Sequence, residues 1–350
     1  MSDLTIGLLS ALLATNQPQA VSNLVQQHTG ISVAVPDANN PEEQELRTVM
    51  VDDDAALDEV NAWMATNQIP RQDTNAAAIF NAKVRARLDE VKHAYQHFLR
   101  NHPDSARGFL AYGTFLNDIG EEEAAKDQYE NSRLLDPKNP AVWNQLANYY
   151  GEWGGLTNAF ADYTEAIRLD PTEPVYYENF ATTVYLFRKD AREFYGINEQ
   201  QVFDKALGLY RQAMKLAPDD LVLATDYAES YYGIRPLRTN DALLAWTNCL
   251  NICKDENEWE GILIHLARIK IASGSYDDAQ ADLNAITNAS FADMRNHLLR
   301  NIAQDKETGN KQTTVPEIPK TPPEPAPPPP AERISTNAIK LQATPPALHP

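Results

Sequence analysis

The chain has 350 residues, of which 43% are hydrophobic and 23% are charged, as in ordinary soluble globular proteins. Its 49 acidic residues outnumber its 30 basic residues, and the net charge of −19 disfavours general binding to nucleic acids or to anionic membranes. Neutral or cationic protein and peptide partners fit this charge better. The two cysteines, Cys249 and Cys253, are too few for a disulfide framework and indicate a reducing compartment.

Residues 1–70 are predicted to form a helical N-terminal region. Periodicity predicts helices near residues 4–12, 19–30 and 56–68. The last of these would carry on one side Leu57, Val60, Trp63 and Met64. A helical cap on the rest of the chain is favoured over a helix on a membrane surface, because the latter typically has a polar face rich in Lys and Arg.

No Lys or Arg precedes Arg47, and no apolar run reaches the roughly 18 residues of a membrane-spanning helix. Neither a secretory signal nor a membrane span is therefore predicted, and we expect a cytoplasmic protein with no membrane contact.

From about residue 76 a pattern of 34 residues recurs. One unit carries Trp143, Leu146, Ala147, Tyr150, Ala159, Tyr163, Ala166 and Pro171. The preceding unit carries, at identical offsets, Phe109, Tyr112, Gly113, Leu116, Ala125, Tyr129, Ser132 and Pro137. Apolar residues three and four apart form one helical face, a small residue lets a second helix approach, and the proline ends that helix.

These residues resemble the signature of the tetratricopeptide repeat, W-x2-L-G-x2-Y, then A-x3-F, then P. The chain is also similar to uncharacterised bacterial proteins with such repeats. The resemblance covers residues 76–303 and implies a right-handed α-solenoid of about five helix pairs, because one pair cannot bury its apolar face alone. A half-repeat (Tyr95, Phe98, Pro103) would begin this array, and a capping helix would close it. The capping helix would carry Phe291, Met294, Leu298 and Ile302.

Three further units show more variation from the pattern. The third has Tyr177, Phe180, Ala181, Val184, Ala206, Tyr210, Ala213 and Pro218; the fourth has Tyr227, Ala228, Tyr231, Ala242 and Trp246; the fifth has Leu263, Leu266, Ala267, Ala279 and Leu283. Residues 310–350 are predicted to be a disordered tail, and the proline-rich stretch 316–330 within it can form only polyproline II.

The third unit contains 13 extra residues, because Pro218 follows Pro171 by 47 residues instead of 34. They fall in the connection between the two helices of the unit, where Gly196 marks a turn and Asn198 with Gln201 matches a capping box. We expect no helix break over residues 185–195. The result would be a helix pair about two turns longer than its neighbours, projecting by about 9 Å.

The concave surface of the array is the expected binding groove, lined by the first-helix residues that directly follow the aromatic position and the small position of the repeat. These groove residues are Asn144, Asn148, Glu178, Thr182, Thr225 and Glu229, with Tyr185 and Tyr232 one turn later. Asparagine side chains at such positions donate to and accept from the backbone of an extended peptide. The alternative is that these polar residues are merely solvated. A clamp of Lys and Arg for a C-terminal carboxylate, known in some of these repeats, is absent, because its positions hold Val175, Glu178 and Asn179.

The projection and the neighbouring connection carry five cations that are expected to gather on one edge. This basic rim consists of Arg188, Lys189, Arg192, Arg235 and Arg238. The simpler interpretation is that these side chains pair internally with carboxylates such as those of Asp190, Glu193 or Asp204. The alternative is a dedicated binding edge.

No catalytic motif occurs in the chain, and we expect neither catalytic residues nor a cofactor or metal. The favoured function is a non-enzymatic scaffold that binds a peptide or protein through the groove or the extended third repeat. One alternative is an enzyme or enzyme subunit with a small site in the N-terminal region or at His93 and His97, which share a helix face. Another is that the proline-rich tail carries the binding. The oligomeric state is not predicted.

Overall fold

The computed structural model of the protein describes residues 40–66 and 74–308. Within these ranges the chain forms 14 α-helices, two short 3-10 helices and no strand, which confirms the all-α fold class. The helices form two compact units, one ending at Pro171 and the other beginning at Thr172, each with its own hydrophobic core. The helices expected near residues 4–12 and 19–30 and the proline-rich tail lie outside the described residues.

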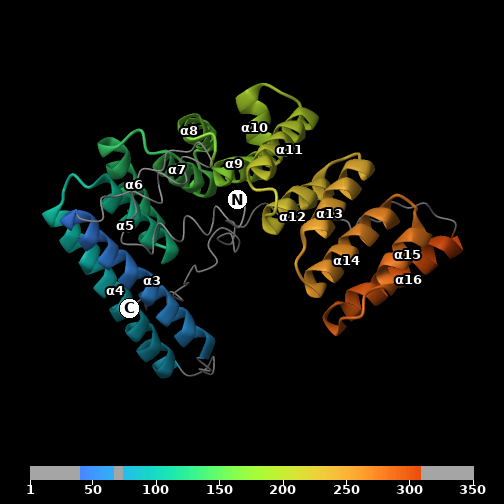
Figure 1. Cartoon of the computed structure of the whole chain (residues 1–350), viewed down its shortest axis with the longest axis horizontal. Coiled ribbons are helices and arrows are strands. Elements are labelled where there is room, and N and C mark those ends of the chain that lie inside the picture. The colour runs from blue at the N-terminus through green and yellow to red at the C-terminus, as the bar shows by residue number, and fades with distance from the viewer. Residues whose placement is uncertain (1–39, 67–73, 309–350) are drawn as a thin grey trace, which may run out of the picture. The chain divides into compact units, whose positions relative to one another are not determined.

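The first unit begins with two long helices that lie side by side, α3 (Pro41–Thr66) and α4 (Thr74–Asn101) (Figure 1). α3 begins at Pro41 instead of near residue 56, because the Asn40 side chain accepts the backbone N–H of Glu42 at 3.0 Å and so caps the helix. Its acidic first turn is favourable at the positive end of the helix dipole. Met64 was expected on the buried side of α3 and is 42% exposed.

Asp53 of α3 is held in an unfavourable environment against α4. One of its carboxylate oxygens accepts the Tyr95 hydroxyl at 2.8 Å, and the other is buried without a hydrogen-bond partner. Burial, opposed by this hydrogen bond, raises the pKa of Asp53 to about 7, and the charges of Asp54 and Asp118 raise it further. Ionised Asp53 therefore destabilises the α3–α4 pair.

Asp53→Asn should flatten the pH dependence of stability. The folded-state pKa lies above the ordinary value of 3.8, so the stability associated with Asp53 is present below about pH 4 and is lost as pH rises toward about 7. We expect the variant to match the wild type near pH 4 and to be more stable by on the order of 1–2 kcal/mol at pH 8, allowing for solvent screening. Thermal unfolding at both pH values measures this; an equal gain at both would contradict it.

The two regular repeats are antiparallel helix pairs. The first pair is α5 (Ala106–Asp118) with α6 (Glu122–Leu135), and the second is α7 (Pro140–Trp153) with α8 (Leu156–Leu169). In the first pair the Ser132 hydroxyl near the end of α6 donates to the Ala106 carbonyl at the start of α5, at 2.8 Å. Gly113 in α5 lies against the Tyr129 ring, where a Cβ atom would come within 2.6 Å of the ring. The small residue of the repeat therefore sets the distance between the helices.

The second unit consists of α9 (Pro174–Leu186), α10 (Arg188–Tyr195), α11 (Glu199–Leu216), α12 (Leu221–Ser230), α13 (Thr239–Ile252), α14 (Glu256–Ala272), α15 (Tyr276–Asn284) and α16 (Ala292–Thr308). α9 pairs with α11, α12 with α13, and α14 with α15. α16 contacts both α14 and α15 and buries Leu298 and Ile302, as expected of a capping helix. Met294, expected on the same side, is 47% exposed.

The expectation of an unbroken helix over residues 185–195 is wrong. α9 ends at Leu186, Phe187 leaves helical geometry with φ −100° and ψ 43°, and the separate eight-residue helix α10 follows (Figure 1). Ala191 is the buried residue of α10, and α10 contacts α11, so the break lets this small residue pack. The turn itself is as expected: Gly196 is left-handed at φ 64°, and Asn198 and Gln201 form the capping box. α11, with 18 residues, is the lengthened helix.

In the described ranges, none of the helices combines enough length with enough hydropathy to cross a membrane.

Candidate functional site

The expected groove residues of the second unit lie on two helices, α9 and α12. Glu178, Thr182 and Tyr185 are spaced four and three residues apart and so share one side of α9. Glu178 is close enough to Asp226 of α12, and to Asp220 at the start of that helix, for their charges to raise its pKa. We call this surface the α9–α12 face. It consists of Glu178, Thr182, Tyr185, Thr225, Asp226 and Glu229.

Glu178 forms the acidic end of this face. Burial, followed by the charges of Asp226 and Asp220, raises the pKa of Glu178 to about 7. Along the described parts of the chain, no Lys, Arg or His nitrogen lies within 4.0 Å of the Glu178 carboxylate. A partially buried carboxylate without a counter-ion favours an incoming cationic group.

The Thr182 hydroxyl makes a hydrogen bond within the pair formed by α9 and α11. It lies 2.8 Å from the hydroxyl of Tyr210 on α11. The same position of the preceding repeat, 34 residues earlier, is Asn148, which accepts the Tyr163 hydroxyl at 2.7 Å. One repeat earlier Thr114 lies beside Tyr129. The residue after the small position thus contacts the tyrosine of the second helix in three successive repeats.

Two groove residues, Asn144 and Asn148, belong to the first unit. Asn144 is only 7% exposed. Both polar groups of the Asn148 amide are engaged, since its nitrogen donates to the Gln145 side chain at 3.1 Å and its oxygen accepts from Tyr163. The sequence pattern located these side chains on the first helix of the repeat, but it carried no signal for these internal hydrogen bonds.

Tyr185 lies at the other end of the α9–α12 face, against the 3-10 turn that follows α12. A Cβ atom at Gly233 would come within 2.0 Å of the Tyr185 hydroxyl oxygen, so that oxygen lies directly against the Gly233 backbone. Burial raises the pKa of Tyr185, and the nearby charges of Arg188 and Arg235 oppose this rise. Only glycine at position 233 leaves room for this contact. No sequence pattern marked Gly233 as part of this face.

The remaining groove residues are partly engaged in internal contacts. The Thr225 hydroxyl donates to the Val222 carbonyl at 2.7 Å. The Tyr232 hydroxyl lies 3.1 Å from His265 Nδ1, and the Arg268 guanidinium lies 4.7 Å from the centre of the Tyr232 ring. Burial and then the charge of Arg268 lower the pKa of His265 to about 4, so this imidazole stays neutral at physiological pH.

The five cations of the basic rim are not equally compensated. Arg238 donates to Asp204 and, at 3.0 Å, to Gln200. Arg188 lies 3.4 Å from Glu199, and Arg235 donates to the backbone carbonyls of Tyr232 and Ile234 instead of to a carboxylate. Lys189 and Arg192 are exposed and, as far as the structure describes the chain, have no carboxylate within 4.0 Å.

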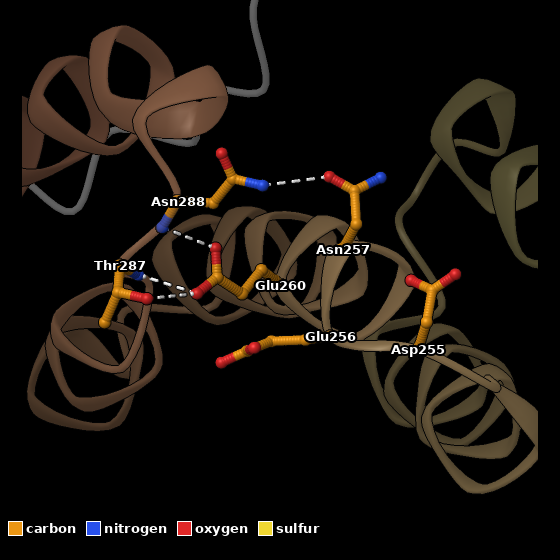
Figure 2. Close-up of a pocket in the computed structure, with 6 residues that line it drawn as sticks. All are labelled: Asp255, Glu256, Asn257, Glu260, Thr287 and Asn288. Carbon is orange, nitrogen blue, oxygen red and sulfur yellow. Dashed lines mark hydrogen bonds between the residues drawn. The ribbon is translucent and has the colours of Figure 1, made fainter.

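A hollow of about 480 Å³ lies beside α14 and is lined by Asp255, Glu256, Asn257, Glu260, Thr287 and Asn288 (Figure 2). Glu260 accepts the backbone N–H groups of Thr287 and Asn288, both at 2.8 Å, and the Thr287 hydroxyl at 2.9 Å. The Thr287 N–H group in particular holds the pKa of Glu260 below its usual range. This carboxylate fastens the connection between α15 and α16 onto α14 and is already occupied.

His93 and His97 lie on α4, as expected. His97 Nδ1 lies 3.3 Å from the Asn101 amide nitrogen. Over residues 40–66 and 74–308, there is no group of three or more His, Cys, Asp or Glu side chains placed to hold a metal ion.

The paired helices, the close contact at the small residue and the recurring tyrosine contact define an α-helical repeat protein of the solenoid class. A sequence profile of the tetratricopeptide repeat matches residues 140–173, which comprise α7, α8 and the turn after them. The chain is a protein containing tetratricopeptide repeats. Stacked repeats of this kind form extended surfaces suited to protein partners.

Several solved structures have similar backbones. The C-terminal part of a tetratricopeptide-repeat protein from Cytophaga hutchinsonii is 16% identical, with a TM-score of 0.47 over 72% of this chain and 98% of that one. PilF of Pseudomonas aeruginosa is 14% identical, with a TM-score of 0.45 over 74% and 99%. YrrB, described as a repeat protein with an unusual peptide-binding site, is 12% identical, with a TM-score of 0.44 over 61% and 98%. No curated protein matches the chain in sequence.

Proposed function

We propose that the protein is a non-enzymatic, cytoplasmic scaffold that binds a peptide or protein partner along the α9–α12 face. The observation that carries this proposal is the uncompensated Glu178 carboxylate, which burial, Asp226 and Asp220 bring to a pKa of about 7. Keeping an ionisable group in such a place costs stability, and costs of this kind are common at functional sites. The free thiols of Cys249 and Cys253 are in keeping with a reducing compartment.

A basic side chain of the partner is the group that fits Glu178. An ammonium or guanidinium group beside the carboxylate would stabilise its ionised form and return its pKa toward the ordinary value of 4.5. Thr225 and Glu229, on the facing helix, would contact the same segment. Binding should therefore be accompanied by proton release near pH 7.

The test is capture of partners from cell lysate on the immobilised chain, followed by mass spectrometry. The test variant is Glu178→Gln with Glu229→Gln. The matched control is Asp219→Asn with Glu307→Gln, which changes the net charge equally at two exposed carboxylates of the same unit that have no ion pair in the described structure. We expect the test variant to retain its fold and to lose the partner by roughly tenfold, with the control unchanged. Equal capture by all three proteins would refute binding at this face.

A further inference from the structure

The basic rim and the α9–α12 face meet at the N-terminus of α11. Glu199 and Gln200 are consecutive residues there: Glu199 pairs with Arg188 at 3.4 Å, and the Gln200 side chain donates to the Arg235 carbonyl at 2.8 Å. Gln200 also accepts from Arg238. The connection between α9 and α11 and the connection between α12 and α13 are therefore fastened to the same point. Arg188 and Arg235, 47 residues apart in sequence, are brought to the same end of the face.

Tyr185 lies close to both arginines. Its hydroxyl oxygen lies against the Gly233 backbone, and a phenol hydroxyl can donate to a carboxylate. The charges of Arg188 and Arg235 act on this hydroxyl, and the carboxylate of Glu229 acts on it with the opposite sign and as a weaker influence. Two guanidinium groups and a phenol hydroxyl are the donors that a carboxylate takes.

These cations are weakly compensated from within the protein. The pair of Arg188 with Glu199 is exposed, with side chains 45% and 51% exposed, and such pairs contribute only about 0–1 kcal/mol. Among the described residues, the Arg235 guanidinium donates to backbone carbonyls, which fix it in place without neutralising it. Arg192 has no carboxylate within 4.0 Å in the part of the chain that the structure describes.

We propose that Tyr185, Arg188 and Arg235, with Arg192 at their edge, form a binding site for the carboxylate of an Asp or Glu side chain in the peptide that occupies the α9–α12 face. This inference rests on the proposed function and adds a charge pattern to the partner. The protein as a whole carries a charge of −19, so an acidic side chain is repelled elsewhere and attracted here. The rim thus fixes the register of the bound segment.

The distance between the two ends of the α9–α12 face predicts the distance between the charged residues of the peptide. Glu178 and Tyr185 are seven residues apart on α9, which corresponds to about 10 Å of helix rise. An extended chain covers this length in about three residues. A suitable peptide should therefore carry a basic residue and an acidic residue separated by roughly three or four positions.

The test is selection of short random peptides displayed on phage against the intact chain. Displayed peptides contain no phosphate, and fusion to the coat protein removes their free C-terminus, so Asp and Glu are their only anions. The rim variant is Arg188→Gln with Arg192→Gln and Arg235→Gln. The matched control is Arg211→Gln with Lys215→Gln and Lys254→Gln, which removes three exposed cations of the same unit that have no ion pair in the described ranges.

We expect the wild type and the control to enrich peptides with the basic and acidic residues at the stated spacing. The rim variant should lose the acidic preference, with binding of the selected peptides weakened by roughly tenfold. Retention of the acidic preference by the rim variant, or its loss in the control, would overturn the carboxylate site. Peptides selected only for a basic residue, and lost on Glu178→Gln, would overturn this inference but support the proposed function. Failure to enrich any peptide on the wild type would overturn both.

Discussion

Glu260→Ala is expected to lower the unfolding temperature of the protein by roughly 5–10 °C, more than any other single carboxylate removed from the second unit. Glu260 is 1% exposed and accepts three hydrogen bonds from Thr287 and Asn288. Alanine would leave two backbone N–H groups and a hydroxyl, at the partly buried Thr287 and Asn288, without their acceptor. Loss of such a hydrogen-bond network is among the mechanisms that make single substitutions strongly destabilising.

Two variants separate this explanation from a general effect of charge. Glu256→Ala removes an exposed carboxylate from the lining of the same hollow and should change the unfolding temperature little (Figure 2). Glu260→Gln retains one oxygen acceptor of similar shape and should give an intermediate loss. Because Glu260 fastens α16 to α14, hydrogen exchange in Glu260→Ala should rise first in α16. Equal losses for Glu256→Ala and Glu260→Ala would contradict the role given to these hydrogen bonds.

The repeats were predictable from sequence because their physical cause is local and periodic. The expected core positions Tyr129, Tyr163 and Ala147 are buried, and Gly113 makes the close helix contact for which the pattern calls. The capping box at Asn198 was also predictable, since it depends on two residues three positions apart.

The break at Phe187 was not predictable in the same way. Residues 185–195 contain no proline or glycine, and nothing in their local propensity opposes one continuous helix. The structure instead turns the chain so that Ala191 packs and α10 lies on α11. Tertiary packing decided the outcome, and the periodicity of the sequence does not report contacts between helices.

In the candidate site, too, periodicity predicted which residues share a helix face but not which contacts they make. Sequence periodicity grouped Glu178, Thr182 and Tyr185 on one side of a helix, which holds in the structure. It did not distinguish Thr182, whose hydroxyl contacts that of Tyr210, from Glu178, which has no cationic nitrogen within 4.0 Å among the described residues. Partners such as Tyr210, Asp226 and Gly233 come from other helices and turns, so only the folded chain identifies them.

Replacing a helical glycine with alanine at two positions tests whether the repeat needs a small residue at the helix contact. Gly113 of α5 and Gly208 of α11 both lie inside helices, where replacing glycine with alanine ordinarily stabilises by about 0.5–1 kcal/mol. At Gly208 the nearest atom to an added Cβ is the end of the Arg211 side chain, 3.8 Å away, so Gly208→Ala should stabilise by that amount. At Gly113 the added Cβ would lie 2.6 Å from the Tyr129 ring and 3.2 Å from the Ala125 carbonyl oxygen.

Gly113→Ala should therefore destabilise the protein by about 2–3 kcal/mol, because the Tyr129 ring and α6 must move to admit one methyl group. Denaturant unfolding of both variants measures the two effects with the same chemical change. If the loss at Gly113 is due to this contact, then Tyr129→Phe should not relieve it, since the ring and not the hydroxyl is in the way. Tyr129→Leu should relieve part of it. A stabilising Gly113→Ala would mean that the helices of this repeat are not held at the distance that the tyrosine ring sets.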